Sequence, residues 1–175
     1  MDVNLKSVYL MCHEVLPIME KQKSGAIISL ASISALAWIG KAQVGYSATK
    51  AAIIQFTRVT AVMYAKKGIR YLGSLNRFPT SLFLKRVAHI LHRINVVVPG
   101  LIHTPLVGML ADKYNNGDYE GLVKKRDAAV PMGTMGSAFD IANAIAFLVS
   151  DCAGHITGTQ LVVDGGVTCR STDGG

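Results

Sequence analysis

The sequence predicts an α/β fold built on a parallel sheet, and two observations predict it. Helical and strand patterns alternate along the 175 residues, an order that is typical of strands joined by crossover helices. The strand patterns at residues 25–30 and 94–98 are short, mostly apolar runs, as expected where helices cover both faces of a sheet. Half of the residues are hydrophobic, so the chain can bury a substantial core. We therefore expect a single domain over residues 1–175.

Two helices and one strand are predicted in the first part of the chain. Over residues 2–19, apolar side chains recur at spacings of three and four, which predicts a helix with one buried face. A buried parallel strand follows at 25–30, and the small, serine-containing stretch 31–43 indicates a loop at its C-terminal end. A second helix is expected at 44–67, because Gly68 ends it. The buried face of the first helix is expected to hold Leu5, Val8, Tyr9, Cys12 and Leu16.

The later part of the chain carries two further strands with helical segments between them. The strand at 94–98 is ended by Pro99 and Gly100. Residues 104–127 are expected to be helical in pieces, with a break at 115–117, where two asparagines precede a glycine.

The C-terminal region predicts one more helix and a last strand. Ser137 and Asp140 have the spacing of a capping box, so a helix is expected to start there and to reach about Ser150. The last strand is expected at 160–163, and the Asp-Gly-Gly sequence at 164–166 gives a structural turn after it. Residues 168–175 are expected to form a disordered tail.

The segment 71–93 does not fit this alternation. It separates Arg70 from Ile94, where a connection of a few residues would suffice. It has no acidic residue, and its apolar residues follow no clean period. We predict that 71–93 is a non-native insertion, a retained intron, because its removal joins Gly68-Ile69-Arg70 directly to the next strand. The alternative is a true helical insertion over about 81–92 that packs on the sheet edge.

Composition argues against several classes of function. The net charge of +7 could suggest a nucleic-acid partner, but several basic residues lie in the acid-free segment 71–93 and the others are spread along the chain, so none is expected. We see neither a membrane-spanning apolar run nor a secretory signal. The five histidines lack metal-ligand spacing, so no metal is expected. A cytoplasmic location is predicted, because reduced thiols suit the scattered Cys12, Cys152 and Cys169.

The stretch GYSATKAAIIQF at 45–56 places a phenol and an ammonium group one helical turn apart. Tyr46 and Lys50 stand at positions i and i+4 and therefore share one face of the predicted helix. A nearby ammonium group lowers the pKa of a phenol toward the neutral range, where the phenol can exchange protons. Surface tyrosines and lysines often have this spacing as well, so the surrounding sequence decides between the two interpretations.

The surrounding sequence resembles the short-chain dehydrogenase/reductase family. The resemblance covers nearly the whole chain apart from 71–93 and the residues after Gly166. It implies a Rossmann-like, doubly wound parallel sheet and an NAD(P)-dependent oxidoreductase that interconverts a ketone and a secondary alcohol by hydride transfer. The matching motifs, in family order, are NLKSVYL at 4–10, GAIISLASISAL at 25–36, YSATK at 46–50, INVVVPGLIHTP at 94–105, DIANAIAFLVSD at 140–151 and ITGTQLVVDGG at 156–166.

The resemblance implies a role for each matching site residue. Tyr46 corresponds to the catalytic acid/base, and Lys50 to the lysine that lowers the tyrosine pKa and binds the cofactor ribose. Ser32 corresponds to the serine that orients the substrate carbonyl, with Ser34 as a competing candidate. Asn4 corresponds to the asparagine that supports a water in the proton relay. The turn that holds the nicotinamide carboxamide corresponds to Pro99, Gly100, Ile102 and Thr104.

The family pattern begins with a strand and a glycine-rich turn that are not found before Asn4. The chain therefore resembles the second part of the fold, with an incomplete cofactor site and no residue that would separate NAD from NADP. We expect an N-terminally truncated chain. The first hypothesis is an oxidoreductase whose intact form is a dimer or tetramer associating through helices 4–19 and 44–67. The alternative is an inert fragment that binds no cofactor and acts by pairing with complete subunits.

Overall fold

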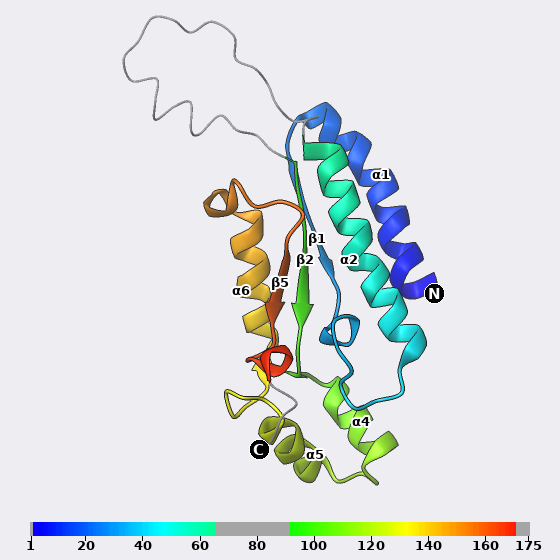
Figure 1. Ribbon diagram of the computed structural model, residues 1–175, viewed down its shortest axis with the longest axis vertical. Coiled ribbons are helices and arrows are strands. Elements are labelled where there is room, and N and C mark those ends of the chain that lie inside the picture. Colours follow the sequence, from blue (N-terminus) through cyan, green and yellow to red (C-terminus); the bar gives the residue numbers. More distant parts are fainter. Residues whose placement is uncertain (1, 66–91, 171–175) are drawn as a thin grey trace, which may run out of the picture.

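The computed structural model describes residues 2–65 and 92–170. Three parallel strands, β1 (Gly25–Leu30), β2 (His92–Pro99) and β5 (Gln160–Val163), form a sheet in the order β1-β2-β5. Helices lie on both sides of this sheet (Figure 1). The predicted α/β fold with a parallel sheet is therefore confirmed, and β5 has the predicted bounds.

Helices α1 (Ser7–Gln22) and α2 (Val44–Ala65) cover one face of the sheet, and α6 (Ala138–Val149) covers the other (Figure 1). A π-helical turn, η1 (Asp2–Lys6), precedes α1. The central strand β2 contributes side chains to the cores on both faces of the sheet, because successive side chains of a strand point in opposite directions. Val96 and Val98 pack with Ile53 from α2, whereas Val97 packs with Leu148 from α6.

A second layer lies beyond the C-terminal ends of the strands. It contains α4 (Leu106–Tyr114) and α5 (Tyr119–Ala128), which share a small core around Val107 and Leu122. The predicted break between the helices is confirmed, and Gly117 there has a φ of +79°, which favours glycine. Two short strands, β3 (Ile102–His103) and β4 (Gly136–Ser137), pair at the base of this layer.

The helix ends follow their sequence signals. At the start of α6, the Ser137 hydroxyl accepts from the Asp140 N–H and the Asp140 carboxylate accepts from the Ser137 N–H, which confirms the predicted capping box. Short 3-10 turns complete the described chain at Ile33–Ala35 (η2), Asp151–Ala153 (η3) and Val167–Cys169 (η4).

Three sequence-based expectations differ from the structure. Tyr9 is 54% exposed, because α1 packs inward through Cys12 and Leu16 while the Tyr9 ring lies against Phe56 at the flank. The chain is ordered beyond the expected start of the tail, because Thr168 donates to Asp164 from both its N–H and its hydroxyl; residues 171–175 lie outside the described part.

Strand β2 begins earlier than expected, at His92 rather than Ile94. Its first two residues, His92 and Arg93, belong to the predicted insertion and pair with Gly25 and Ala26 of β1. Residues 71–91, the rest of that insertion, lie outside the described residues.

Within residues 2–65 and 92–170, no helix is long and apolar enough to cross a membrane. The same residues contain no cluster of histidine, cysteine or acidic side chains that could hold a metal ion.

Candidate active site

Tyr46 and Lys50 lie on the first turns of α2, near the C-terminal end of β1. The Lys50 ammonium group is 5.7 Å from the centre of the Tyr46 ring, so the two side chains share a face as their spacing predicts. The Lys50 Nζ donates to the Leu30 carbonyl oxygen at 2.9 Å, which fixes the lysine to the end of β1. Partial burial lowers the pKa of Lys50 from its ordinary value. Tyr46 remains 40% exposed and so is open to a ligand.

Asn4 is held against the same part of α2. Its amide Nδ2 donates to the Thr49 hydroxyl at 3.1 Å, and that hydroxyl donates to the Tyr46 carbonyl oxygen at 2.8 Å. Thr49 is buried, so this chain of hydrogen bonds sits in a protected environment. It ties the N-terminal turn of the chain to the backbone of Tyr46.

Ser32 lies two residues after the end of β1 and caps the short turn η2. Its hydroxyl oxygen accepts from the Ser34 N–H at 3.3 Å and from the Ser34 hydroxyl at 3.1 Å. Ser34 is buried, whereas Ser32 is half-buried. Because a hydroxyl oxygen that accepts twice still has its own proton to donate, Ser32 can donate a hydrogen bond to a ligand.

The turn after β2 is packed tightly against the turn after β5. The Gly100 N–H donates to the Val163 carbonyl oxygen at 2.9 Å. A Cβ atom on Gly100 would lie 2.6 Å from the Asp164 Cα, so only glycine fits there. Hydrogen bonds from Gly166 and Thr168 to the Asp164 carboxylate hold the second turn in shape. Pro99 and Gly100 are thereby fixed at the C-terminal edge of the sheet.

Ile102 and Thr104 continue from this turn toward α4. Ile102 pairs with Gly136 in the β3–β4 ladder, and the half-buried Thr104 accepts the first hydrogen bond of α4 from the Val107 N–H. Next to them, the Tyr119 hydroxyl lies 2.8 Å from the His103 Nε2. This contact attaches the start of α5 to β3, beside a hollow of about 480 Å³.

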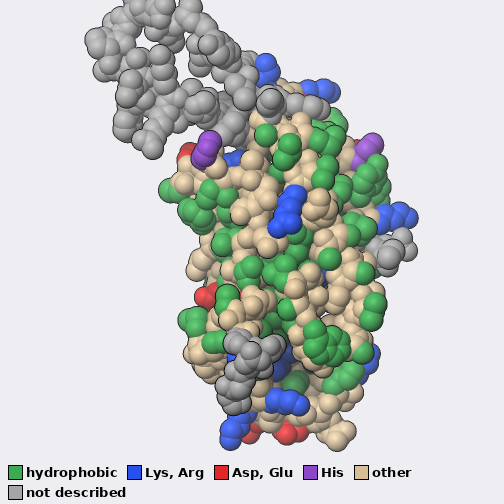
Figure 2. All heavy atoms as spheres, in the orientation of Figure 1, with side chains coloured by type: hydrophobic (Ala, Val, Ile, Leu, Met, Phe, Trp, Pro, Cys, Tyr) green, Lys and Arg blue, Asp and Glu red, His purple; other side chains and the backbone are tan. Residues whose placement is uncertain are grey.

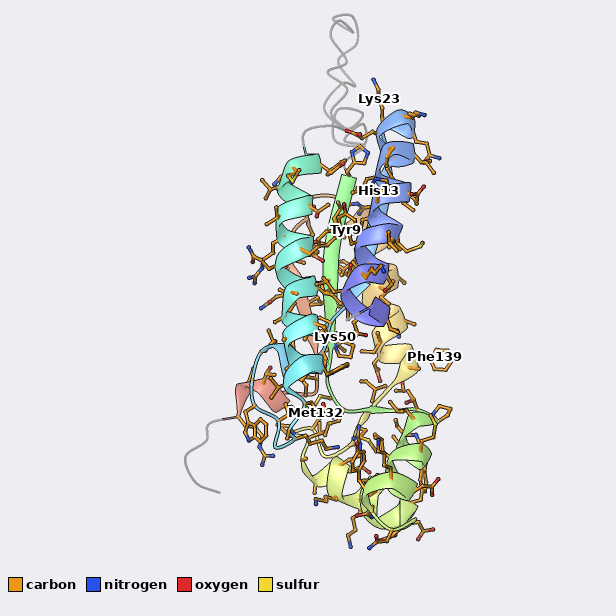
Figure 3. The ribbon with its side chains drawn as sticks, turned by 90° about the vertical axis from the view of Figure 1, so that its right-hand side faces the viewer. Tyr9, His13, Lys23, Lys50, Met132 and Phe139 are labelled. Atoms are coloured by element: carbon orange, nitrogen blue, oxygen red, sulfur yellow. The ribbon has the colours of Figure 1, made fainter. Side chains whose placement is uncertain are left out.

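The structure brings some of the predicted site residues together and leaves others apart. Asn4 and Lys50 both line a groove of about 420 Å³ between α1 and the outer edge of β1; Figure 3 shows Lys50 between α1 and α2. No hydrogen bond within the described residues joins Ser32 or Thr104 to Tyr46. These groups lie on separate segments at the same end of the sheet, which is where parallel α/β sheets bind ligands.

Sequence reasoning missed several groups around the site. The Leu30 carbonyl binds Lys50, and the Thr49 hydroxyl binds Asn4. Neither group gives a sequence signal, because every residue has a carbonyl and small polar residues are common in helices. The β3–β4 ladder was also missed, since strands of two residues show no period. The role of Asp164 as a hydrogen-bond acceptor could have been found from the Asp-Gly-Gly sequence, because Asp often accepts from backbone N–H groups two residues on.

Two family models match consecutive parts of the chain. The model described as short chain dehydrogenase matches residues 1–73, and the model described as enoyl-(acyl carrier protein) reductase matches residues 86–168. The chain belongs to the short-chain dehydrogenase/reductase family. Neither match includes residues 74–85 of this short-chain dehydrogenase/reductase.

Individual relatives give the same result and show a difference in length. The oxidoreductase UcpA of Escherichia coli K12 is 31% identical over 171 residues, a match that covers 98% of this chain and 56% of UcpA. A solved structure from Burkholderia xenovorans, assigned to the same family, has a TM-score of 0.77 and 46% identity, covering 96% of this chain and 55% of the relative. The structure of ElxO with NADP bound has a TM-score of 0.73 and 27% identity, and the match covers 95% of this chain and 56% of ElxO. This chain therefore spans about half the length of these relatives.

Proposed function

We propose that the chain carries the catalytic part of an NAD(P)-dependent oxidoreductase that interconverts a ketone and a secondary alcohol. The observation that carries this proposal is the pairing of Tyr46 with Lys50, 5.7 Å from ring centre to ammonium, at the end of the sheet where Ser32 and the Pro99–Gly100 turn also lie. Tyr46 has a hydroxyl open to a ligand and a fixed cation beside it. This arrangement suits proton exchange with a substrate oxygen.

Each site residue has a defined task in this proposal. Ser32 donates a hydrogen bond to the carbonyl oxygen of the ketone and orients it. Tyr46 gives its hydroxyl proton to that oxygen as the alcohol forms, and it takes the proton back in the reverse direction. The Lys50 charge stabilises the phenolate left behind, and Asn4, through Thr49, positions the first turns of α2. Ser32 is favoured over Ser34 as the residue that orients the substrate carbonyl, because Ser34 is buried and its hydroxyl donates to Ser32.

The residues present fit the nicotinamide end of a dinucleotide. When bound, the nicotinamide supplies or accepts the hydride at the carbon of the substrate. Lys50 uses one of its three N–H donors on Leu30, which leaves two for a ribose hydroxyl. Thr104 and the tight Pro99–Gly100 turn offer polar groups for a carboxamide at the same edge. ElxO, which was solved with NADP, supports a nicotinamide cofactor for the family, and the choice between NAD and NADP stays open.

The main alternative is an inert fragment that binds no cofactor and pairs with complete subunits. This chain spans 55–56% of the length of UcpA and of the Burkholderia xenovorans relative. Apolar side chains on the outer faces of α1 and α2 suit association into a dimer or tetramer; Figure 2 shows such side chains at the surface. These are Leu10 and Ile18 on α1 and Val59, Val62 and Met63 on α2, all at least 49% exposed. A cytoplasmic location is proposed because the three cysteines are free.

A fusion protein separates the two candidates. In it, the part of the Burkholderia xenovorans relative outside the match precedes residue 1 of this chain. The oxidoreductase proposal predicts that the fusion binds NADH or NADPH and consumes it with at least one member of a panel of aliphatic and aromatic ketones. A folded fusion that binds the cofactor but reduces none of the ketones contradicts the proposed reaction. A folded fusion that binds neither cofactor favours the inert alternative.

A further inference from the structure

The loop 36–43 leads from η2 into α2 and so into Tyr46. Its Ile39 packs on the core cluster around Ile33 and Ile53, and Val167 of η4 packs on the same cluster. This shared packing holds the loop and η4 at the end of the sheet where the candidate active site lies.

The C-terminal end of α5 is attached to the same η4 region. The Met132 N–H donates to the Gly165 carbonyl oxygen at 3.3 Å. Arg170, which follows η4, donates from its Nη1 to the Ala129 carbonyl oxygen at 3.1 Å. The loop 36–43 and the last turn of α5 are distant in sequence, but both are therefore anchored at η4.

Basic side chains gather where these segments meet. The last turn of α5 carries Lys125 and Arg126, and the loop contributes Lys41; Figure 2 shows Lys and Arg side chains at the lower end of the molecule, where α5 lies. Burial lowers the pKa of Lys41, and the nearby positive charges of Arg126 and Lys125 lower it further. Like charges that the fold holds together repel one another, and a bound anion would relieve this repulsion.

Arg126 is half-buried and has donors to spare. Its Nε donates to the Met135 sulfur at 3.2 Å, which leaves the N–H groups of both terminal nitrogens. The Asp127 carboxylate beside it accepts from the Met135 N–H at 2.7 Å. Within residues 2–65 and 92–170, neither Arg126 nor the two lysines form an ion pair. Basic residues often end a helix because they complement its dipole, but Lys41 belongs to a different segment.

We propose that Lys41, Lys125 and Arg126 bind an anionic group of the substrate, a carboxylate or a phosphate ester, while the substrate carbonyl lies at Tyr46. This proposal rests on the reaction proposed above. Lys41 stands five residues before Tyr46, on the loop that enters α2, so the chain itself links the cations to the reacting group. The planar fork of Arg126 suits carboxylate and phosphate oxygens. The substrate class is therefore an oxo acid or a phosphorylated ketone rather than a neutral ketone.

Substrate pairs that differ in charge test this class in the fusion protein described above. Linear oxo acids are compared with their methyl esters, and phosphorylated hydroxyketones with the unphosphorylated compounds. We expect the fusion to favour one of the anionic forms by about 10- to 100-fold in kcat/KM, mainly through KM, and the pair with the larger ratio identifies the anion. Turnover of the neutral forms that equals or exceeds that of the anionic forms would overturn the anion site and leave the proposed reaction intact.

Substitutions at the cations locate the effect. Arg126→Gln should abolish the preference by raising the KM for the anionic substrate. Lys41→Met should reduce the preference by about two- to fivefold, and Lys41→Arg should restore it. Arg58→Gln removes an exposed charge on α2 and should keep the preference. If Arg126→Gln instead raises the KM for the cofactor, the cations bind cofactor phosphates and the proposal is overturned.

A second measurement tests the anion site without catalysis. Thermal unfolding of the full 175-residue chain is followed in inorganic phosphate, with the ionic strength held constant by NaCl. Phosphate that binds the folded chain raises the Tm, and this rise should be smaller in Arg126→Gln than in the wild-type protein and in Arg58→Gln. Equal rises in all three would overturn the site. A rise that depends on Arg126 supports the site even if the fusion reduces no ketone, and only the proposed reaction then fails.

Discussion

Single residues at the C-terminal edge of the sheet keep the candidate site in shape. Asp164 is the clearest case, since its carboxylate accepts from Gly166 and twice from Thr168. Burial alone raises the pKa of Asp164, but these hydrogen bonds outweigh burial and hold the pKa below its ordinary value. A carboxyl with a lowered folded-state pKa stabilises the fold above its unfolded pKa, and this contribution is lost as the pH falls through the lowered value.

Asp164→Asn should therefore lower the Tm at neutral pH, and the difference from the wild-type protein should shrink as the pH falls below about 4. Thermal unfolding followed by circular dichroism across this pH range measures both values. Asp112→Asn is the control, because Asp112 is exposed on α4 and should show little difference at any pH. A Tm difference that stays constant down to low pH would contradict the assigned role of the carboxylate.

Gly100 was predicted only as the end of a strand and as part of a family motif. The structure shows why glycine is required at this position, because the residue packs against the Asp164 backbone. Gly100→Ala should destabilise the fold, because its Cβ would lie 2.6 Å from the Asp164 Cα. Denaturant unfolding should show a loss of roughly 1 to 3 kcal/mol. Gly108→Ala, where a Cβ meets no atom within 4 Å, should not destabilise α4.

Among the elements, segments with a clear period or an end signal could be predicted from sequence, and short segments with neither could not. The helices follow from repeated spacings and from end signals such as the capping box of Ser137. The strand β5 has only four residues, and it was predicted because the Asp-Gly-Gly sequence at 164–166 ends it. The ladder of β3 and β4 is only two residues on each side, so it depends on tertiary contacts. Motif spacing selects Tyr46 and Lys50, but it cannot reveal that the Leu30 carbonyl binds the lysine, because any residue offers a carbonyl.

The start of β2 bears on the predicted insertion. His92 is 1% exposed, and neither ring nitrogen has a hydrogen-bond partner in the described part of the chain. Arg93 donates to the carbonyl oxygens of Val149 and Ser150 at the end of α6. If residues 71–93 were absent, Ile69 and Arg70 would precede Ile94 in their place. An isoleucine would suit the buried position, and an arginine would keep the contact with α6.

His92→Ile should stabilise the protein by roughly 1 to 3 kcal/mol, because it removes an unpartnered polar ring from a buried position. Denaturant unfolding measures this difference. His155→Ile, at an exposed position, should change the stability little. A clear loss of stability in His92→Ile would mean that the imidazole has a partner outside the described residues.

Deletion of residues 71–93 should raise the Tm and reduce aggregation, since it restores a short connection between α2 and β2. The matched control deletes only 71–91, which keeps His92 and Arg93 and leaves the connection two residues longer. The insertion hypothesis predicts that the larger deletion is the more stable of the two. The insertion hypothesis would be wrong if deleting 71–93 makes the chain less stable or less soluble than the intact protein. Transcripts that uniformly retain the segment, without flanking splice-site dinucleotides, would exclude an intron.

For the whole molecule, the described part forms a three-stranded parallel sheet and a two-stranded ladder, and the candidate site lies at the C-terminal end of the larger sheet. Much of the affinity for a dinucleotide comes from the pyrophosphate at a helix N-terminus behind a glycine-rich turn, and the sequence has no such turn before Asn4. We expect the isolated chain to bind NAD(H) and NADP(H) weakly or not at all. Calorimetric titration measures this affinity, and a Kd in the micromolar range or below would contradict the expectation.

The most direct test of the proposed chemistry is the rate of ketone reduction by the fusion protein with Tyr46→Phe. This substitution removes the hydroxyl that exchanges a proton with the substrate oxygen and keeps the ring beside Lys50. We predict a loss of turnover of about 10²- to 10⁴-fold, with unchanged folding, while Tyr9→Phe on α1 keeps the wild-type rate. A Tyr46→Phe fusion that retains a substantial fraction of wild-type turnover would contradict the central role of Tyr46.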